Sequence, residues 1–256
     1  MPPLFDTHMT SSHTSNGSTA KAPNTKLILW DIDGTIVIVK RGVYDPLFAE
    51  MCRTVYGQEV EMGNYRYSGK TDRGIIHELG EMAGFSEVDI EERLPEATQF
   101  IARGLEKRLD VKDITLLPNV LELLEIFDKH EGVVQGLLTG NLPECAELKL
   151  RPFEVQKYFK FGVYGIESRD RNDLGPIALE RAIEHMPHPP KHPKDVVIIG
   201  DSIRDVECAN AIGATCIITL TGHTKVEEIA HLDPDHIVED LSDTDQIIRM
   251  VMGEAL

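Results

Sequence analysis

The 256-residue chain is 41% hydrophobic, enough for one large domain or one domain plus a smaller one, and its formal net charge is -17. This acidic excess disfavours nucleic acid and anionic membranes as partners, because both present dense negative charge. No apolar run approaches the roughly 18 residues of a membrane span. Four scattered cysteines without a CxxC pair predict a reduced, cytoplasmic protein with no cysteine zinc site.

The first segment, residues 1–24, is rich in Ser, Thr, His and Pro and shows no periodic apolar face. This composition predicts a disordered tail. The segment lacks both the apolar centre of a secretory signal and an Arg-rich amphipathic pattern, although a transit peptide stays open as an alternative.

Four apolar runs have the character of buried β-strands, at 27–30, 133–138, 195–199 and 214–220. Helical patterns at 118–129 and 174–186 lie between them. Strands that alternate with helices predict an α/β fold, in which a parallel sheet with right-handed crossovers is flanked by helices. We expect this core domain to comprise residues 25–39 and 114–256.

Residues 40–113 break the alternation with a long, charged and mostly helical segment. Its candidate helices are 44–56, 72–83 and 90–109, and Pro95 predicts that the third helix begins or bends there. The simplest interpretation is an inserted α-helical cap domain that lies over the carboxyl end of the sheet as a lid. The alternative is a helical subdomain that only packs against the core.

Two acids one residue apart follow the first strand, in Asp31-Ile32-Asp33-Gly34-Thr35. Residues two apart in a strand share a face, so Asp31 and Asp33 are expected to face one cavity at the carboxyl end of the sheet, where α/β folds bind ligands. Adjacent carboxylates repel each other, so the pair predicts a divalent metal, acid–base chemistry or both. One of them can also act as a nucleophile. The alternative is an Asp-Gly turn with incidental acids.

The run at 133–138 ends in Thr139-Gly140-Asn141. A hydroxyl and free backbone N–H groups at a strand end suit a phosphoryl oxygen. Alternatively, Thr139 or Asn141 caps a helix that starts at Pro143.

A cation is expected next along the chain. The segment 167–173 contains Arg169 and Arg171 and no lysine. A guanidinium can pair with a phosphate or with a nucleophilic carboxylate. The alternative is a solvated charged loop.

Gly200 and Asp201 end the third apolar run, and Asp205 lies four residues further on. If a helix starts near Ser202, Asp205 falls in its first turn and both acids can face the same site. Such hard oxygen ligands are what Mg²⁺ prefers. The alternative for Asp205 is a favourable acid at a helix N-terminus.

Together and in this order, the four segments closely resemble the haloacid dehalogenase superfamily of Asp-nucleophile hydrolases, from about residue 26 to residue 240. The family motif hhhhDxDGT matches at Asp31, hhh[ST]G followed by Asn matches at Thr139, and hhhhGDxxxD matches at Asp201. The third motif departs from the family, because its usual lysine is replaced by Arg171 or Arg169.

The resemblance implies a Rossmann-like core, Mg²⁺ and a mechanism. Asp31 would attack phosphorus to form an aspartyl phosphate, Asp33 would protonate the leaving oxygen and then activate water, and Thr139 would bind the phosphoryl group. The arginine would orient the nucleophile. Mg²⁺ would be held by Asp31, the backbone carbonyl of Asp33, Asp201 and Asp205. The expected substrate-binding residues are Thr35, Lys70, Thr71, Arg73, Gly140 and Asn141.

Asp33 favours phosphate-ester chemistry over dehalogenation, because an ester leaving group needs a proton. The long gap between the first two motifs indicates a class I cap. Within it, the Gly-Lys-Thr-Asp segment at 69–72 resembles that of phosphoglycolate phosphatase-like members and would present Lys70 or Arg73 to an anionic substrate. The alternative is a helix start with Thr71 or Asp72 as N-cap.

We therefore expect a Mg²⁺-dependent phosphatase that hydrolyses a small phosphorylated metabolite such as phosphoglycolate, as a monomer or homodimer. One alternative is a sugar phosphomutase of the beta-phosphoglucomutase type, although such mutases usually have a hydrophobic residue where Thr35 stands. The other alternative is a non-enzymatic binding protein with a relic site.

Overall fold

The computed structural model describes residues 25–40, 42–63 and 65–253, so the predicted tail lies outside the described residues. A six-stranded, entirely parallel sheet forms the core, in the order β5-β4-β1-β6-β7-β8. Its strands are β1 (Lys26–Trp30), β4 (Val133–Leu138), β5 (Phe161–Val163), β6 (Val196–Gly200), β7 (Thr215–Thr219) and β8 (His236–Val238). The predicted α/β fold with a parallel sheet is confirmed.

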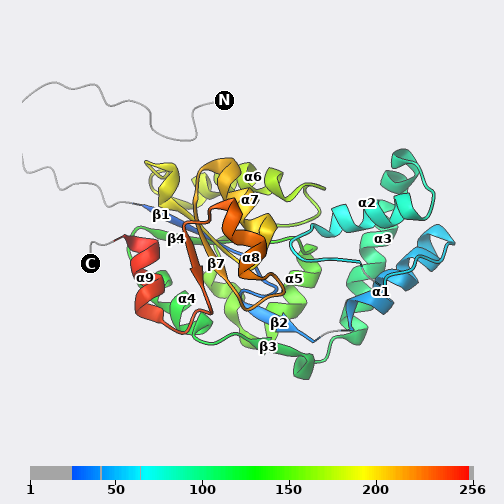
Figure 1. The fold of residues 1–256 in the computed structure, drawn as a ribbon, viewed down its shortest axis with the longest axis horizontal. Helices are drawn as coiled ribbons and strands as arrows, with labels where there is room; N and C mark the ends of the chain where they lie inside the picture. Colours follow the sequence, from blue (N-terminus) through cyan, green and yellow to red (C-terminus); the bar gives the residue numbers. More distant parts are fainter. Residues whose placement is uncertain (1–24, 41, 64, 254–256) are drawn as a thin grey trace, which may run out of the picture.

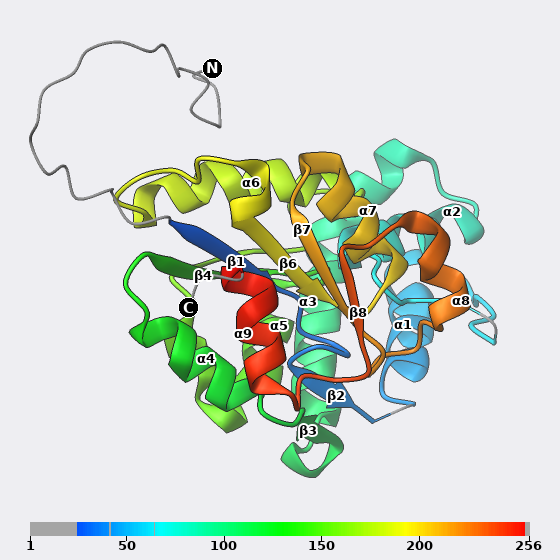
Figure 2. The ribbon, with the colours of Figure 1, turned by 60° about the vertical axis from the view of Figure 1, so that its left-hand side comes forward.

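The sheet is covered by helices on both faces (Figures 1 and 2). On one face lie α4 (Val120–Lys129), α5 (Pro143–Leu150) and α9 (Thr244–Met252), and on the other lie α6 (Leu174–Ala182) and α7 (Ile203–Ile212). Every residue of β1 and β6 is buried, as expected for strands with apolar neighbours on both sides. The short helix α8 (Val226–Ile229) follows β7.

A helical insertion separates β1 from β4 and forms the lobe on the right of Figure 1. At its base, β2 (Val37–Val39) pairs antiparallel with β3 (Ile114–Leu116). The lobe contains α1 (Tyr44–Met51), a π-helical turn η1 (Cys52–Tyr56), α2 (Asp72–Met82) and α3 (Glu87–Arg108), which pack around a hydrophobic core that also includes Leu142 and Cys145 of the core domain. We call this insertion the lid.

The third lid helix begins earlier than predicted and continues through Pro95. The Ser86 hydroxyl accepts a hydrogen bond from the backbone N–H of Asp89 (3.3 Å), and the Asp89 carboxylate accepts one from the backbone N–H of Ser86 (3.3 Å). This capping box fixes the helix start at Glu87, while Pro95 removes only one backbone donor. The helix therefore starts three residues before the expected residue 90 and does not begin at Pro95.

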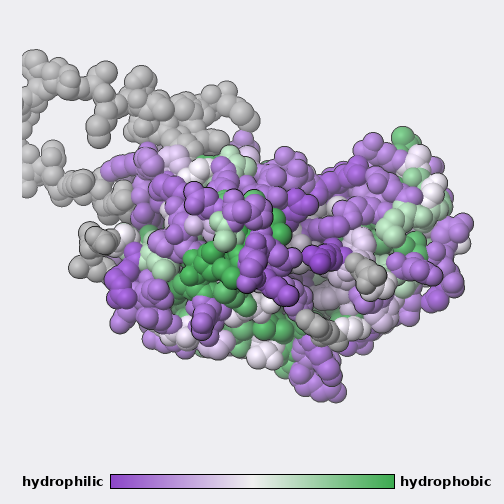
Figure 3. All heavy atoms as spheres, viewed as in Figure 1, coloured by the Kyte–Doolittle hydropathy of each residue, from purple (hydrophilic) through white to green (hydrophobic). Residues whose placement is uncertain are grey.

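Short 3-10 turns connect several elements, and one of them carries a candidate site residue. They are η2 (Val111–Asp113), η3 (Arg151–Phe153), η4 (Val155–Tyr158), η5 (Arg171–Asp173), η6 (Ile183–His185), η7 (Pro193–Asp195) and η8 (Ala230–Leu232). Among the described helices, none combines the length and the apolar content that a membrane span requires. The face shown in Figure 3 is mainly hydrophilic, with a hydrophobic patch in the middle of the core lobe.

Candidate active site

The candidate site lies at the carboxyl ends of the central strands. Trp30 of β1 is in register with Leu137 of β4 and with Ile199 of β6, so the residues that follow these three strands are neighbours. They surround a cavity of about 440 Å³ between the sheet and the lid. The core residues that line it include Asp31, Asp33, Gly34, Thr139, Gly140, Asn141, Lys149, Arg171 and Asp201.

Three buried aspartates form a compact acid cluster. Asp31, Asp201 and Asp205 each place a carboxylate oxygen within 4.8 Å of the others. Asp205 is fixed by the start of α7, where its carboxylate accepts hydrogen bonds from the backbone N–H (3.0 Å) and the hydroxyl (2.6 Å) of Ser202. Gly200 permits this arrangement, because a Cβ there would lie 2.2 Å from the Asp205 carboxylate carbon.

Arg171 is the cation of this cluster. Its buried guanidinium lies 3.1 Å from Asp31 and 2.5 Å from Asp205, and it also donates to the carbonyl of Leu138 (3.2 Å). Arg169 lies two residues earlier but is directed outward, where it pairs with Glu81 (3.1 Å) and Glu87 (3.0 Å) of the lid. The structure thus places Arg171, and not Arg169, beside the candidate nucleophile.

One guanidinium does not neutralise three buried acids. Burial, together with the charges of neighbouring acids, raises the pKa of Asp31 to about 6, even though Arg171 opposes the shift. Burial and the charges of Asp31 and Asp205 also raise the pKa of Asp201 well above its ordinary value, and in the described part of the chain no ion pair reaches this carboxylate. A compact set of hard, under-compensated oxygen donors fits Mg²⁺.

Two glycines allow the backbone to approach Asp201 closely. A Cβ on Gly34 would lie 2.5 Å from an Asp201 carboxylate oxygen, and one on Gly222 would lie 1.6 Å from it. Gly34 also has a φ of +78°, which side-chain-bearing residues rarely adopt. The glycine of the first motif is therefore required both by its backbone conformation and by the space that Asp201 occupies.

The second acid of the first motif has a buried partner that sequence reasoning missed. Asp33 Oδ2 lies 2.5 Å from Nζ of Lys149 and accepts a hydrogen bond from Nδ2 of Asn141 (2.8 Å). Lys149 also donates to Oδ1 of Asn141. A signal existed in the sequence, because Lys149 shares the buried face of α5 with Cys145, Ala146 and Leu150, where an unpaired lysine is almost never found.

The second motif joins the core site to the lid. The Thr139 hydroxyl is buried and accepts hydrogen bonds from the backbone (3.3 Å) and side-chain (2.7 Å) nitrogens of Asn141. Gly140 lies directly against the lid, since a Cβ there would be 2.1 Å from the carbonyl oxygen of Lys70. Asp72 completes this contact, donating its backbone N–H to Gly140 (2.6 Å) and accepting from that of Leu142 (2.7 Å).

Four of the expected substrate-binding residues either pair with another residue of the protein or lie outside the cavity lining. Thr71 caps α2 by accepting from the backbone N–H of Gly74 (3.0 Å), and Arg73 pairs with Glu91 (2.7 Å) outside the set of cavity-lining residues. Thr35 is fully buried and does not line the cavity. Lys70 does line the cavity, but its ammonium is 2.5 Å from Glu78.

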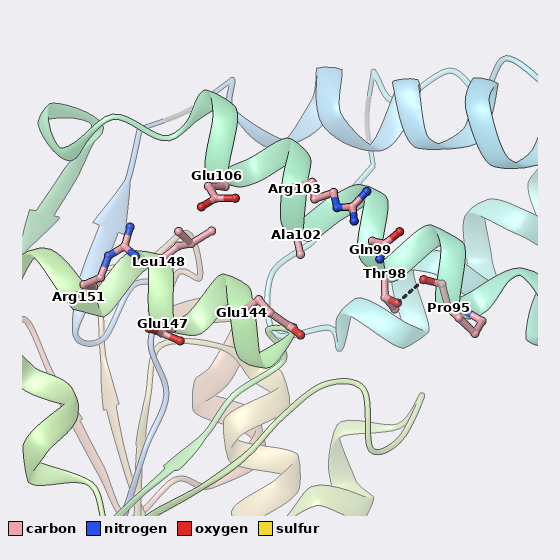
Figure 4. Close-up of a pocket in the computed structure, with 10 residues that line it drawn as sticks. All are labelled: Pro95, Thr98, Gln99, Ala102, Arg103, Glu106, Glu144, Glu147, Leu148 and Arg151. Atoms are coloured by element: carbon pink, nitrogen blue, oxygen red, sulfur yellow. Dashed lines mark hydrogen bonds between the residues drawn. The ribbon is translucent and has the colours of Figure 1, made fainter.

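A second hollow, of about 540 Å³, lies between α3 of the lid and α5 of the core (Figure 4). The side of α5 that faces it contributes Glu144, Glu147 and Leu148, while the buried face of the same helix carries Lys149. None of the motif residues lines this hollow. The motif residues lie around the first cavity and around a smaller hollow of about 260 Å³ that shares Lys70 and Arg171 with it.

Comparisons with known proteins agree with this geometry. The chain is 27% identical over 228 residues to a phosphoglycolate phosphatase from Nitrosospira multiformis, a match that covers 88% of this chain and 96% of that protein. A shorter match, 26% identical over 125 residues, covers 49% of this chain and 54% of a putative pyrophosphatase PpaX from Caldanaerobacter subterraneus.

The fold is also similar to solved structures. A predicted phosphoglycolate phosphatase from Haemophilus somnus superimposes with a TM-score of 0.63 at 19% identity, covering 89% of this chain and 99% of that one. The family model for haloacid dehalogenase-like hydrolases matches residues 25–213, which include the acid cluster, Arg171 and the whole lid. The chain therefore belongs to the haloacid dehalogenase-like hydrolases.

Proposed function

We propose that this protein hydrolyses phosphate monoesters of small alcohols in a Mg²⁺-dependent reaction, with Asp31 as the nucleophile. The observation that carries the proposal is the position of Asp31 at the end of β1, in contact with Arg171 and within an acid cluster that lacks sufficient positive charge. A dianionic phosphate can approach such a cluster only when cations compensate the charge.

In the proposed first step, an Asp31 carboxylate oxygen forms a bond to phosphorus while the bond from phosphorus to the ester oxygen breaks. Asp33 donates its proton to the departing alkoxide, so that the alcohol leaves neutral. In the second step, Asp33 takes a proton from water as the water oxygen attacks phosphorus. The bond between phosphorus and Asp31 then breaks, which releases phosphate and restores both carboxyl groups.

The other cavity residues support these steps through position and charge. Arg171 holds Asp31 in place and offsets its charge, and Thr139 with the Gly140 backbone is placed to receive the phosphoryl oxygens. Asp31, Asp201 and Asp205 would hold Mg²⁺, joined by the backbone carbonyl of Asp33. The bound ion would lower the charge repulsion between phosphate and carboxylates.

The proposed substrate class is small organic phosphate monoesters. Relatives of this chain carry the name phosphoglycolate phosphatase, which makes phosphoglycolate the reference substrate for a small organic phosphate monoester.

The experiment that tests the proposal is phosphate release from p-nitrophenyl phosphate with and without Mg²⁺. We expect turnover that EDTA abolishes and that excess Mg²⁺ restores. Asp31→Asn should abolish turnover while thermal unfolding stays cooperative. Turnover that persists in a clean Asp31→Asn preparation would refute the mechanism, and interconversion of hexose phosphates without phosphate release would favour the phosphomutase alternative.

A further inference from the structure

The lid side of the active-site cavity is a wall of aromatic rings. Tyr44 and Phe48 lie one turn apart on α1, and their ring centroids are 6.5 Å apart. Phe48 stacks on Tyr67 at 5.3 Å, and Tyr67 meets the edge of Tyr65 at 5.0 Å. All four residues line the cavity, but Phe48 is only 1% exposed and supports Tyr44 and Tyr67 from behind. The ammonium groups of Lys70 and Lys149 lie over the rings of Tyr65 (4.5 Å) and Tyr44 (5.0 Å), so the aromatic surface open to a substrate centres on Tyr67 and Tyr65.

The cavity has room for more than a phosphoryl group and a two-carbon acid. Its volume of about 440 Å³ lies within the range of roughly 300–1,000 Å³ that is typical of pockets for drug-sized ligands. Beyond the four rings, the lid and its base add the apolar side chains of Ile38, Val39 and Ile75 to the lining. The part of the cavity that faces an alcohol leaving group is thus largely apolar.

The charges around the cavity disfavour a second anionic group on the substrate. Each lysine and arginine among the described lining residues lies against a carboxylate, in the pairs Lys40–Asp113 (3.6 Å), Lys70–Glu78 (2.5 Å), Lys149–Asp33 (2.5 Å) and Arg171–Asp31 (3.1 Å), and His223 is the other basic residue of this lining. The lid also places Asp45 and Asp72 in the lining. A glycolate carboxylate would meet these acids, and the lysines that lie over the rings of Tyr65 and Tyr44 are already paired with Glu78 and Asp33.

We infer that the preferred substrates are phosphate monoesters whose alcohol part is uncharged and carries an aromatic ring, an inference that rests on the proposed phosphatase activity. The phosphoryl group lies at Asp31 and Arg171, and the ring of the substrate packs against Tyr65 and Tyr67, which Phe48 supports from behind. Ring pairs of this kind add attraction beyond the area that they bury. The lid therefore selects the substrate by apolar and aromatic contact and not by pairing with a carboxylate.

The experiment compares three esters of primary alcohols, so that the leaving groups are chemically alike: benzyl phosphate, ethyl phosphate and 2-phosphoglycolate. Initial rates of phosphate release with saturating Mg²⁺ give kcat/KM for each ester. Burying the aromatic ring that benzyl phosphate has and ethyl phosphate lacks corresponds to a preference of about tenfold or more in kcat/KM. We expect kcat/KM for benzyl phosphate to exceed the other two values by at least that factor.

Substitutions in the aromatic wall test where the preference originates. Tyr67→Leu should lower the ratio of kcat/KM for benzyl phosphate to that for ethyl phosphate, and Tyr65→Leu provides a second variant if the first fails to fold. Phe85→Leu is the matched control, because Phe85 is a lid aromatic that packs on Tyr56 and does not line the cavity. A ratio that falls equally in the control would overturn the assignment to this wall.

The two proposals fail in different ways. If no ester is hydrolysed, p-nitrophenyl phosphate included, the proposed function is refuted and this inference falls with it. If the esters are hydrolysed but phosphoglycolate or ethyl phosphate equals or exceeds benzyl phosphate in kcat/KM, the phosphatase stands and the aromatic preference is overturned.

Discussion

Nζ of Lys149 lies 2.5 Å from Oδ2 of Asp33, and this lysine side chain is only 1% exposed. The contact joins the buried face of α5 to the loop after β1, two elements more than a hundred residues apart in sequence. Both Lys149 and Asn141 contact the same Asp33 oxygen, which fixes the orientation of the carboxylate. We therefore regard Lys149 as a positioning residue for the proposed acid and base.

Lys149→Met should lower kcat/KM by about 10- to 100-fold for ethyl phosphate, since general acid catalysis contributes at least that much to expulsion of a basic alkoxide. For p-nitrophenyl phosphate the loss should be smaller, because nitrophenolate leaves without a proton. Rates for the two esters measure this difference directly. Lys149→Arg should recover part of the activity, and the exposed Lys157→Met serves as control. Equal losses of kcat/KM for both esters would contradict a role acting through Asp33 as the general acid, because kcat/KM does not include the later attack of water.

The two arginines of the third segment should behave differently. Arg171→Ala leaves buried acids without their partner, which typically costs about 3–5 kcal/mol, and should abolish turnover. Arg169→Ala removes exposed ion pairs worth about 0–1 kcal/mol and should leave turnover nearly unchanged. Urea unfolding and phosphate release provide both measurements. Loss of turnover in the Arg169 variant alone would reverse the assignment.

Asp72 should contribute a pH dependence to stability that is independent of the acid cluster. Burial raises the pKa of its carboxyl to about 6 from an ordinary value of 3.8, so the folded state binds the proton more tightly than the unfolded state does. Its contribution to stability is therefore present at low pH and is lost as the pH rises through about 6.

Asp72→Asn keeps an oxygen that can accept the hydrogen bond from the backbone N–H of Leu142 but cannot titrate. Urea unfolding of Mg²⁺-free protein between pH 4 and about 7 should show a smaller fall in stability for this variant than for the wild type. Parallel curves for the two proteins would show that Asp72 titrates normally in the folded state.

The contact of the second motif with the lid can be tested at one glycine. A Cβ at Gly140 would lie 2.1 Å from the carbonyl oxygen of Lys70, so Gly140→Ala should displace the lid and lower kcat/KM by about tenfold or more. Gly63→Ala is the matched control, because nothing lies within 4 Å of the corresponding Cβ. Steady-state kinetics with any active ester provides the measurement. Unchanged kinetics in the Gly140 variant would mean that the lid need not dock there during turnover.

Much of the site follows from the sequence, because parallel strands bring their carboxyl ends to one edge of the sheet. This rule places Asp31, Thr139 and Asp201 together once three strands are identified. The same rule does not predict the contact of Lys149 with Asp33, because that contact depends on how α5 packs. The rule also does not distinguish Arg171 from Arg169, because the 3-10 turn that begins at Arg171 determines which guanidinium faces the acid cluster.

The edge strands and one helix start were harder to predict for local reasons. Strands β5 and β8 have three residues each, too few for a hydrophobic pattern to emerge. The start of α3 is encoded by the capping box of Ser86 and Asp89, whereas Pro95, the ninth residue of the helix, is a residue that more often stands in the first turn.

The ribbon formed by β2 and β3 contains both connections between the lid and the core, hydrogen-bonded to each other. The hydrophobic core of the lid also includes Leu142 and Cys145 of the core domain, so this ribbon and the apolar contact together hold the lid over the sheet. Tyr44, Phe48, Tyr65 and Tyr67 are held at the phosphoryl site by the same packing. The packing that positions the rings for the leaving group therefore also limits the entry of bulk water, so a substrate that fits the rings poorly would also react in a wetter, less effective site.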